Sequence, residues 1–187
     1  WPAPVVTPLV HERAMREVYL ASFEAAVREA RPWTVMAAYN RVLGEYATQN
    51  PWLLTAVLRD EWGFDGVVMS DWGATDDRVA ALRAGLDLQM PGVAGAAKPV
   101  VAAVAAGSLD VAYVDASVRR LLDLVDRTEP ARIPAEIDVD AHHALAEEVA
   151  AAGSVLLKND GGLLPLRDAA GLKVAVLGDL ARTPRFQ

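Results

Sequence analysis

The 187-residue sequence has no cysteine, which excludes disulfide bonds and thiolate metal sites. Basic residues are also in deficit, because 18 lysines and arginines face 25 acidic residues and give a net charge of −7. A protein that binds nucleic-acid phosphates needs the opposite balance, so we expect no nucleic-acid partner. No apolar run approaches the roughly 20 residues that cross a bilayer, so we expect no membrane partner either.

The first residues also lack a targeting signal. Residues 1–6, Trp-Pro-Ala-Pro-Val-Val, contain neither the basic segment nor the long apolar segment of a secretory signal peptide. The first residue is not methionine, which indicates a processed or partial product. Cytoplasmic and secreted locations both stay open, and the sequence does not indicate an oligomeric state.

What the sequence does contain is a short apolar run that ends in a carboxylate. Residues 67–69 are Val-Val-Met, they follow Gly66, and they lead into Ser-Asp-Trp-Gly at 70–73. Such a run, bounded by glycines, is typical of a buried strand. A carboxylate beside a tryptophan at a strand end is costly in a core but suits the mouth of a β/α barrel, where strand ends carry the chemistry. We therefore predict that Asp71 is catalytic; the alternative is that it caps the following turn.

Helix and strand patterns alternate along the first two thirds of the chain. Strands are predicted at 34–39, 67–70 and 86–90, with helices at 12–30, 52–62, 75–85, 97–106 and 110–126 around them. This alternation predicts an α/β fold with a parallel sheet. A (β/α)8 TIM-type barrel has eight strands in about 250 residues. Because only three strands are predicted, we expect residues 1–126 to be the C-terminal part of such a barrel.

A change of composition follows the last of these helices. Residues 127–138 hold two prolines and no apolar periodicity, which predicts a linker. A helix is predicted at 140–152, and a buried strand at 173–178, where Lys-Val-Ala-Val-Leu-Gly stands. We expect 139–187 to be the truncated beginning of a second domain, an α/β sandwich.

Several motifs together resemble glycoside hydrolase family 3. They are Arg13-Ala-Met-Arg-Glu-Val-Tyr-Leu20, Val35-Met-Ala-Ala-Tyr-Asn40, Asn50-Pro-Trp-Leu-Leu54 running to Ser70-Asp71-Trp72, Gly85-Leu-Asp-Leu-Gln-Met-Pro-Gly92, and Val155-Leu-Leu-Lys-Asn159 with Leu163-Leu-Pro-Leu166. The motifs follow the order of the family from about residue 11 onward. The Ser-Asp-Trp form is similar to the branch of β-glucosidases and β-xylosidases.

The resemblance implies a retaining exo-glycosidase that releases terminal β-D-glucose from β-glucosides or oligosaccharides. Asp71 corresponds to the family's nucleophile, which forms a covalent glycosyl-enzyme. Retention requires two carboxyl groups about 5–5.5 Å apart, one ionised and one protonated. Tyr39 corresponds to a residue that contacts the bound sugar, Trp72 offers an apolar face to a sugar ring, and Met36 is expected to wall the same pocket.

The sequence also departs from the family pattern. The family's Lys-His pair, which holds sugar hydroxyls, is absent because no Lys-His dipeptide occurs in the sequence. The family's acid/base glutamate is expected in the second domain, past the end of this chain. Two alternatives therefore stay open: a β-xylosidase or other family 3 exo-glycosidase, and an inactive fragment that lacks the acid/base and the sugar-binding pair.

Three other charged residues are weaker candidates. Glu17 and Glu61 lie in predicted helices, where most carboxylates are solvated, so we expect surface positions or ion pairs for both. Arg78 follows Asp71 by seven positions. It could reach a second sugar subsite, but we expect a surface ion pair with nearby acids instead.

The histidines predict no metal site. His142 and His143 are adjacent and therefore point to different faces of their predicted helix, and His11 stands alone. No glycine-rich phosphate-binding pattern is present either. We expect neither a metal nor a cofactor.

Overall fold

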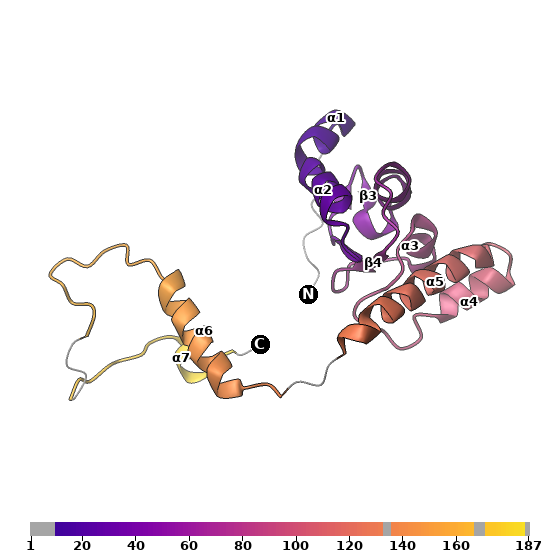
Figure 1. The fold of residues 1–187 in the computed structure, drawn as a ribbon. Coiled ribbons are helices and arrows are strands. Elements are labelled where there is room, and N and C mark those ends of the chain that lie inside the picture. The colour runs from indigo at the N-terminus through magenta and orange to yellow at the C-terminus, as the bar shows by residue number, and fades with distance from the viewer. Residues whose placement is uncertain (1–9, 133–135, 167–170, 186–187) are drawn as a thin grey trace. The chain divides into compact units, whose positions relative to one another are not determined.

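The computed structural model describes residues 10–132, 136–166 and 171–185 (Figure 1). The chain divides into two units, Trp1–Ile133 and Pro134–Gln187. The division falls inside the range 127–138 that the sequence predicts as a linker, although helical structure continues to residue 131. The first unit carries the strands and all of the buried residues that the structure describes.

The first unit begins with a helical stretch that bends near Leu20, where the sequence predicts one continuous helix. Its pieces are α1 (Glu12–Ala14), the π-helix η1 (Met15–Tyr19), α2 (Ala21–Ala25) and the π-helix η2 (Ala26–Ala30). The amide of Leu20 donates to the carbonyl of Met15, five residues back, at 2.8 Å. This wider spacing, which is that of a π-helix, interrupts the regular ladder and allows the change of direction.

Two parallel strands follow the pattern that the sequence predicts. β1 (Thr34–Ala37) pairs with β4 (Val67–Ser70), and Met36 lies opposite Met69 in the register. A hairpin of β2 (Arg41–Val42) and β3 (Glu45–Tyr46) lies between them in the sequence. The mixed helix and strand content and the parallel pairing confirm the α/β prediction for this unit.

The third predicted strand, residues 86–90, is present only in part. It forms a single parallel bridge between Leu88 and Met69. Its backbone nevertheless runs along β4, because Asp87 N–H donates to Val68 O at 2.9 Å and Ser70 N–H donates to Leu88 O at 2.9 Å. The segment is therefore a partner of β4 on the edge opposite β1.

Three of the six remaining helices described in this unit begin beside a side chain that accepts an amide of their first turn. The six are η3 (Ala47–Gln49), the π-helix η4 (Trp52–Glu61), α3 (Arg78–Ala84), α4 (Lys98–Ala105), α5 (Val111–Thr128) and η5 (Glu129–Ala131). Asn50 Oδ1 accepts from Leu53 N–H at 3.0 Å ahead of η4. Asp77 and Asp110 accept amides of the first turns of α3 and α5. Each cap satisfies a donor that the helix itself leaves open.

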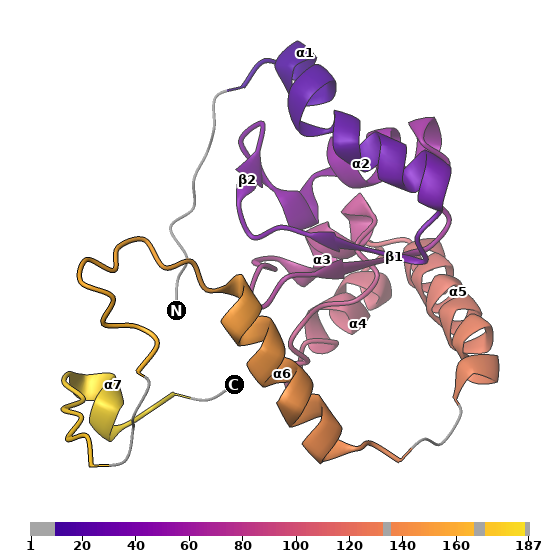
Figure 2. The same ribbon diagram turned by 60° about the vertical axis from the view of Figure 1, so that its left-hand side comes forward.

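The core lies between one face of the strand pair and the helices. Its buried members come from η2, β1, η4, β4, α3 and the segments around them: Val27, Ala37, Leu54, Val57, Leu58, Trp62, Phe64, Val68, Ala81 and Leu86. Figure 2 shows α2 beside β1. Since successive side chains of a strand point to opposite faces, Met36 and Met69 lie on the face turned away from this core.

The second unit contains α6 (Val139–Gly153) and the short α7 (Asp179–Arg182). Every described residue of this unit is exposed except Asn159, which is half-buried. The predicted buried strand at 173–178 is wrong, because residues 172–177 form no strand and Val176 is 72% exposed. A strand needs a neighbour for its backbone groups, and the described part of this unit supplies none. The α/β sandwich remains a prediction.

Candidate functional site at the strand ends

The C-terminal ends of the two paired strands bring the predicted site residues to one edge. Asp71 directly follows β4, and its N–H donates to the carbonyl of Ala37, the last residue of β1, at 2.9 Å. Parallel strands end on the same side of a sheet, so residues that follow β1 and β4 emerge together. In open and closed parallel sheets this is the side where ligands bind.

Residues 86–90 contact the same strand-end edge from the side of β4 opposite β1. Ser70 Oγ accepts from Met90 N–H at 2.8 Å and donates to Met90 O at 3.2 Å. Gly73 N–H donates to the same Met90 carbonyl at 3.1 Å. Asp71 therefore sits on a short turn whose two flanking residues, Ser70 and Gly73, are both bonded to Met90.

The carboxylate of Asp71 is engaged through one oxygen only. Its Oδ1 accepts from Trp72 N–H at 2.6 Å, and its backbone carbonyl accepts from Ala74 N–H at 3.2 Å. Within the described parts of the chain, Oδ2 accepts no hydrogen bond, and the residue as a whole is only half-buried. The local turn contact that the sequence offers as an alternative is thus present at Oδ1, while Oδ2 remains free for a ligand.

The three predicted sugar contacts surround this edge and are all exposed. Met36 is 58% exposed on the face away from the core, Tyr39 is 48% exposed two residues past β1, and Trp72 is 65% exposed beside the carboxylate. These residues therefore share the strand-end edge with Asp71 and are accessible to a ligand.

The two helix glutamates take part in surface ion pairs, as the sequence predicts. Glu17 accepts from Arg13 Nε at 2.9 Å. Glu61 receives two hydrogen bonds from Arg16, at 2.7 and 3.0 Å, which lower the pKa of that carboxyl below its ordinary value. Both carboxylates are thus engaged by arginines of the helical stretch from α1 to η2.

Arg78 does not form the surface ion pair that the sequence predicts. Its guanidinium is half-buried and donates to the backbone carbonyls of Leu86 at 3.4 Å and Asp87 at 3.0 Å. Burial lowers the pKa of Arg78 from its ordinary value. The prediction failed because the guanidinium donates to carbonyls of the 86–90 segment instead of to an acid, and spacing along the chain does not reveal that these groups are close.

The sequence reasoning also missed a buried charge cluster behind the site. Asp87 has no exposed side-chain surface and forms ion pairs with Arg59 at 2.8 Å and Arg120 at 3.0 Å. Burial lowers the pKa of Arg59, and the charge of Asp87 opposes that effect. The sequence did contain a signal for this cluster. The run Leu-Asp-Leu at 86–88 places an aspartate in a predicted buried strand, and a buried carboxylate seldom lacks charged partners.

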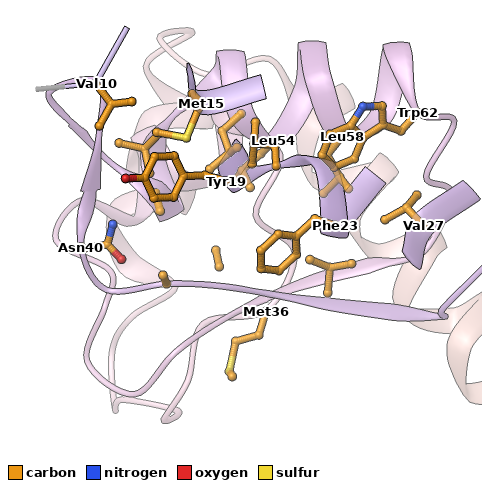
Figure 3. A pocket seen from close by; sticks show the side chains of 17 residues that line it. Val10, Met15, Tyr19, Phe23, Val27, Met36, Asn40, Leu54, Leu58 and Trp62 are labelled. Atoms are coloured by element: carbon orange, nitrogen blue, oxygen red, sulfur yellow. The ribbon is translucent and has the colours of Figure 1, made fainter. Parts of the chain in front are cut away.

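An apolar cavity lies on the helix-covered side of β1. It has a volume of about 430 Å³ and lies between the helical stretch of α1 to η2, β1 and η4 (Figure 3). Tyr19, Asn40 and Trp62 are its only polar side chains, whereas a sugar needs several polar contacts. In Figure 3 the side chain of Met36 points away from the other labelled side chains, across the strand. Met36 is nevertheless among the residues that line the cavity, so the cavity borders the candidate site at that residue, whereas Asp71, Tyr39 and Trp72 do not belong to its lining.

The described residues hold neither a cluster of metal ligands nor a membrane-spanning helix. No group of three or more His, Asp or Glu side chains in 10–132, 136–166 or 171–185 is arranged to hold a metal ion. Over the same ranges, none of the helices combines the length and the apolar character needed to span a bilayer.

Comparison with known proteins connects this geometry to a family. The sequence profile described as "Glycosyl hydrolase family 3 N terminal domain" matches residues 5–124. The chain is 46% identical over 187 residues to an exo-alpha-(1->6)-L-arabinopyranosidase of Bifidobacterium longum, covering 95% of this chain and 25% of that protein. It is 47% identical over 184 residues to the thermostable beta-glucosidase B of Acetivibrio thermocellus, covering 97% and 24%. The chain thus spans about a quarter of the length of these relatives.

Solved structures agree with these matches. A GH3 beta-glucosidase of Bifidobacterium adolescentis has a TM-score of 0.69 and 47% identity, and the match covers 98% of this chain and 27% of that one. Beta-glucosidase 3B of Thermotoga neapolitana in complex with alpha-D-glucose has a TM-score of 0.68 and 42% identity, covering 85% and 24%. These likenesses agree with the mixed α/β fold.

Proposed function

This chain belongs to glycosyl hydrolase family 3, and from that premise we propose that it carries the nucleophile of a retaining exo-glycosidase that releases β-D-glucose from β-glucosides. The observation that carries the proposal is the position of Asp71. It follows β4 directly, its N–H is bonded to the end of β1, and no group of the described residues donates a hydrogen bond to its Oδ2, beside the exposed Trp72. The edge belongs to the C-terminal part of a (β/α)8 barrel in this proposal.

The proposed reaction has two displacements at the anomeric carbon. A carboxylate oxygen of Asp71 attacks that carbon while its bond to the leaving oxygen breaks, and a protonated carboxyl group donates a proton to that oxygen. Water then attacks the glycosyl-enzyme, gives its proton to the same group, and frees Asp71 with the configuration retained. The proton-donating group, about 5–5.5 Å from the nucleophile in such enzymes, is proposed to lie outside residues 1–187.

The exposed side chains at this edge have complementary roles in the proposal. Trp72 offers an apolar face on which a sugar ring stacks. The Tyr39 hydroxyl donates to a sugar hydroxyl or to the nucleophile, and Met36 walls the apolar side of the pocket. Their exposure in the described residues supports these roles, because a sugar contact must be accessible before the ligand binds.

A second candidate substrate is a pentopyranoside, such as a β-xyloside or an arabinopyranoside. One observation favours it: the arabinopyranosidase of Bifidobacterium longum is about as similar to this chain, at 46% identity, as the β-glucosidase of Acetivibrio thermocellus is, at 47%. The two sugar classes differ at C5, where a hexopyranose carries a hydroxymethyl group. Residues that contact C5 therefore decide between them.

Mechanism-based labelling tests the proposal. The protein is incubated with 2-deoxy-2-fluoro-β-D-glucosyl fluoride, or with the corresponding xylosyl fluoride, and intact mass and peptide mapping follow. Fluoride leaves without help from an acid, so a missing proton donor does not prevent the first step. We expect one glycosyl adduct on the peptide that carries Asp71, and none in Asp71→Asn. Asp65→Asn, which alters an exposed carboxylate in the same stretch, is the matched control and should label normally.

The outcomes separate the alternatives. Faster labelling by the xylosyl reagent would favour the pentopyranoside candidate. The third alternative, an inactive fragment, is tested with a chimera in which residues 1–187 replace the matching 27% of the Bifidobacterium adolescentis β-glucosidase. If Asp71 is labelled in the chimera but not in the isolated chain, the isolated chain forms an incomplete pocket. Labelling of another residue, or of Asp71→Asn, would reject Asp71 as the nucleophile.

A further inference from the structure

The buried Asp87 has no part in the reaction above, yet its side chain joins three elements. Its Oδ2 accepts from Arg59 Nη2 of η4 at 2.8 Å and from the N–H of Val68 in β4 at 2.9 Å. Its Oδ1 accepts from Arg120 Nε of α5 at 3.0 Å. All three bonds are made with no exposed surface on the carboxylate. Hydrogen bonds that carry charge are the stronger ones, and here water does not compete.

The backbone of Asp87 is fixed as well. Its N–H donates to Val68 O at 2.9 Å, and its carbonyl accepts from Arg78 Nη2 of α3 at 3.0 Å and from Ser117 Oγ of α5 at 3.2 Å. Asp87 thus forms hydrogen bonds with residues of β4, η4, α3 and α5. These bonds tie the 86–90 segment to β4 and to three helices at residue 87.

The same segment holds the turn that carries Asp71. Three residues beyond Asp87, the backbone of Met90 exchanges two hydrogen bonds with Ser70 Oγ and accepts from Gly73 N–H. Ser70 and Gly73 flank the candidate nucleophile on both sides. A shift of the 86–90 segment along β4 would therefore move the turn, because Met90 would no longer meet both partners.

We propose that Asp87 is a positioning residue for Asp71: with Arg59 and Arg120 it locks the 86–90 segment in the register in which Met90 holds the turn from Ser70 to Gly73. The proposal rests on the proposed role of Asp71 as nucleophile. Positioning matters because a displacement of about 1 Å at a reacting group costs roughly 100-fold in rate. The alternative is that Asp87 contributes only to overall stability.

Amide hydrogen exchange on the full 187-residue chain distinguishes these two roles without relying on activity. Asp87→Asn keeps the size of the side chain but removes the charge. Val57→Ala, which changes a fully buried core residue of η4, is the control for general destabilisation. At conditions that match the two variants in global stability, we expect the Ser70, Gly73 and Met90 amides to exchange at least about 10-fold faster in Asp87→Asn than in Val57→Ala. Equal exchange in both variants would overturn the proposal.

Labelling of Asp71 supplies the second readout, in the chimera described above. We expect the rate constant for adduct formation to fall about 100-fold in Asp87→Asn, with the concentration for half-saturation unchanged and Val57→Ala near wild type. If Asp87→Asn does not fold, Arg120→Gln removes only the Oδ1 partner and should give the same pattern more weakly. A wild-type chimera that labels elsewhere would reject the nucleophile, while the exchange result would still decide whether Asp87 positions the turn.

Discussion

Two similar apolar runs have opposite fates in the two units of this chain. Val-Val-Met-Ser at 67–70 forms β4, and three of its four residues are buried. Val-Ala-Val-Leu at 174–177 forms no strand, and all four residues are exposed. Composition does not separate them. The difference is that β4 has β1 on one edge and the 86–90 segment on the other, whereas the described part of the second unit contains no strand.

The helices, unlike the strands, form in both units, but among the described residues only those of the first unit pack against other elements. α5 and α6 both begin at an aspartate whose carboxylate accepts an amide of the first turn. Both helices form, because a cap and a helical sequence act locally. However, α5 packs against α3 and β4, while α6 leaves Leu145 and Val149 exposed. Local signals thus make helices in either unit, but strands and a core require partners that are far apart in the sequence.

The largest expected effect contrasts one buried and one exposed aspartate. Asp87→Ala should lower the free energy of unfolding of the first unit by about 3–5 kcal/mol, because Arg59 and Arg120 lose their buried counter-charge. Asp160→Ala, which removes an exposed partner of Lys158, should change stability by less than about 1 kcal/mol. Chemical denaturation followed by unit-resolved hydrogen exchange measures both. Equal effects would contradict the contrast between the units.

The next effect compares one substitution at two leucines. Leu86 is fully buried, so Leu86→Ala should cost about 2–5 kcal/mol through lost burial and the cavity left behind. Leu157 is 91% exposed, so Leu157→Ala should stay within about 0.5 kcal/mol. Thermal denaturation gives both values. A large loss for Leu157→Ala would mean that this residue is covered in the folded protein.

A smaller effect on stability is expected when glycine is replaced by alanine in each of the two units. A Cβ at Gly66 would lie 2.2 Å from the carbonyl oxygen of Trp33, so Gly66→Ala should force the strands apart and cost about 1–3 kcal/mol. Gly153, the last residue of α6, has open space around it, and Gly153→Ala should stabilise that helix by up to about 1 kcal/mol. Circular dichroism during thermal unfolding should show a loss of stability for Gly66→Ala and a gain for Gly153→Ala. The same sign for both would argue against the close approach at Gly66.

The smallest expected effect depends on pH. Hydrogen bonds from Arg16 lower the pKa of Glu61 below its ordinary value of 4.5. The ionised glutamate therefore adds stability that is complete above pH 4.5 and is lost as the pH falls through the lower folded-state pKa. Glu61→Gln should flatten the dependence of the melting temperature on pH in that acidic range and change little at pH 7. Because the pair is exposed, 0.5 M salt should reduce the difference in wild type.

Much of the fold was predictable because its signals are local or periodic. The strands at 34–37 and 67–70, the caps at Asn50 and Asp110, and the α/β alternation all follow from patterns in short windows. The strand-end edge was predictable for the same reason, since parallel strands place their ends together. The catalytic role of Asp71 was predicted from its place at a strand end, and its role as nucleophile, like the sugar contacts of Tyr39, Trp72 and Met36, came from a resemblance; all of these roles remain predictions.

The features that were not predictable depend on distant partners. Arg59 precedes Asp87 by 28 positions and Arg120 follows it by 33, so no spacing rule predicts that the three residues meet. Arg78 was assigned to nearby acids, but carbonyl groups of a neighbouring segment bind it. The run at 174–177 has the pattern of a strand and lacks a neighbour. In each case, the missing information is which segments meet in space.

The parallel register between β1 and β4 has an evolutionary consequence. Side chains of a strand alternate between two faces, so adding or deleting one residue within 34–37 or 67–70 would exchange the core face for the opposite face. A change of length within 67–70 would also turn Asp71, which follows β4, to the opposite face, while many single substitutions would leave it in place. Insertions are expected instead at the exposed tip of the β2–β3 hairpin, Leu43 and Gly44, where both residues have positive φ and Gly44 has no close neighbour. Among descendants of this sequence, chain length between Thr34 and Asp71 should vary at that hairpin and stay constant within the strands.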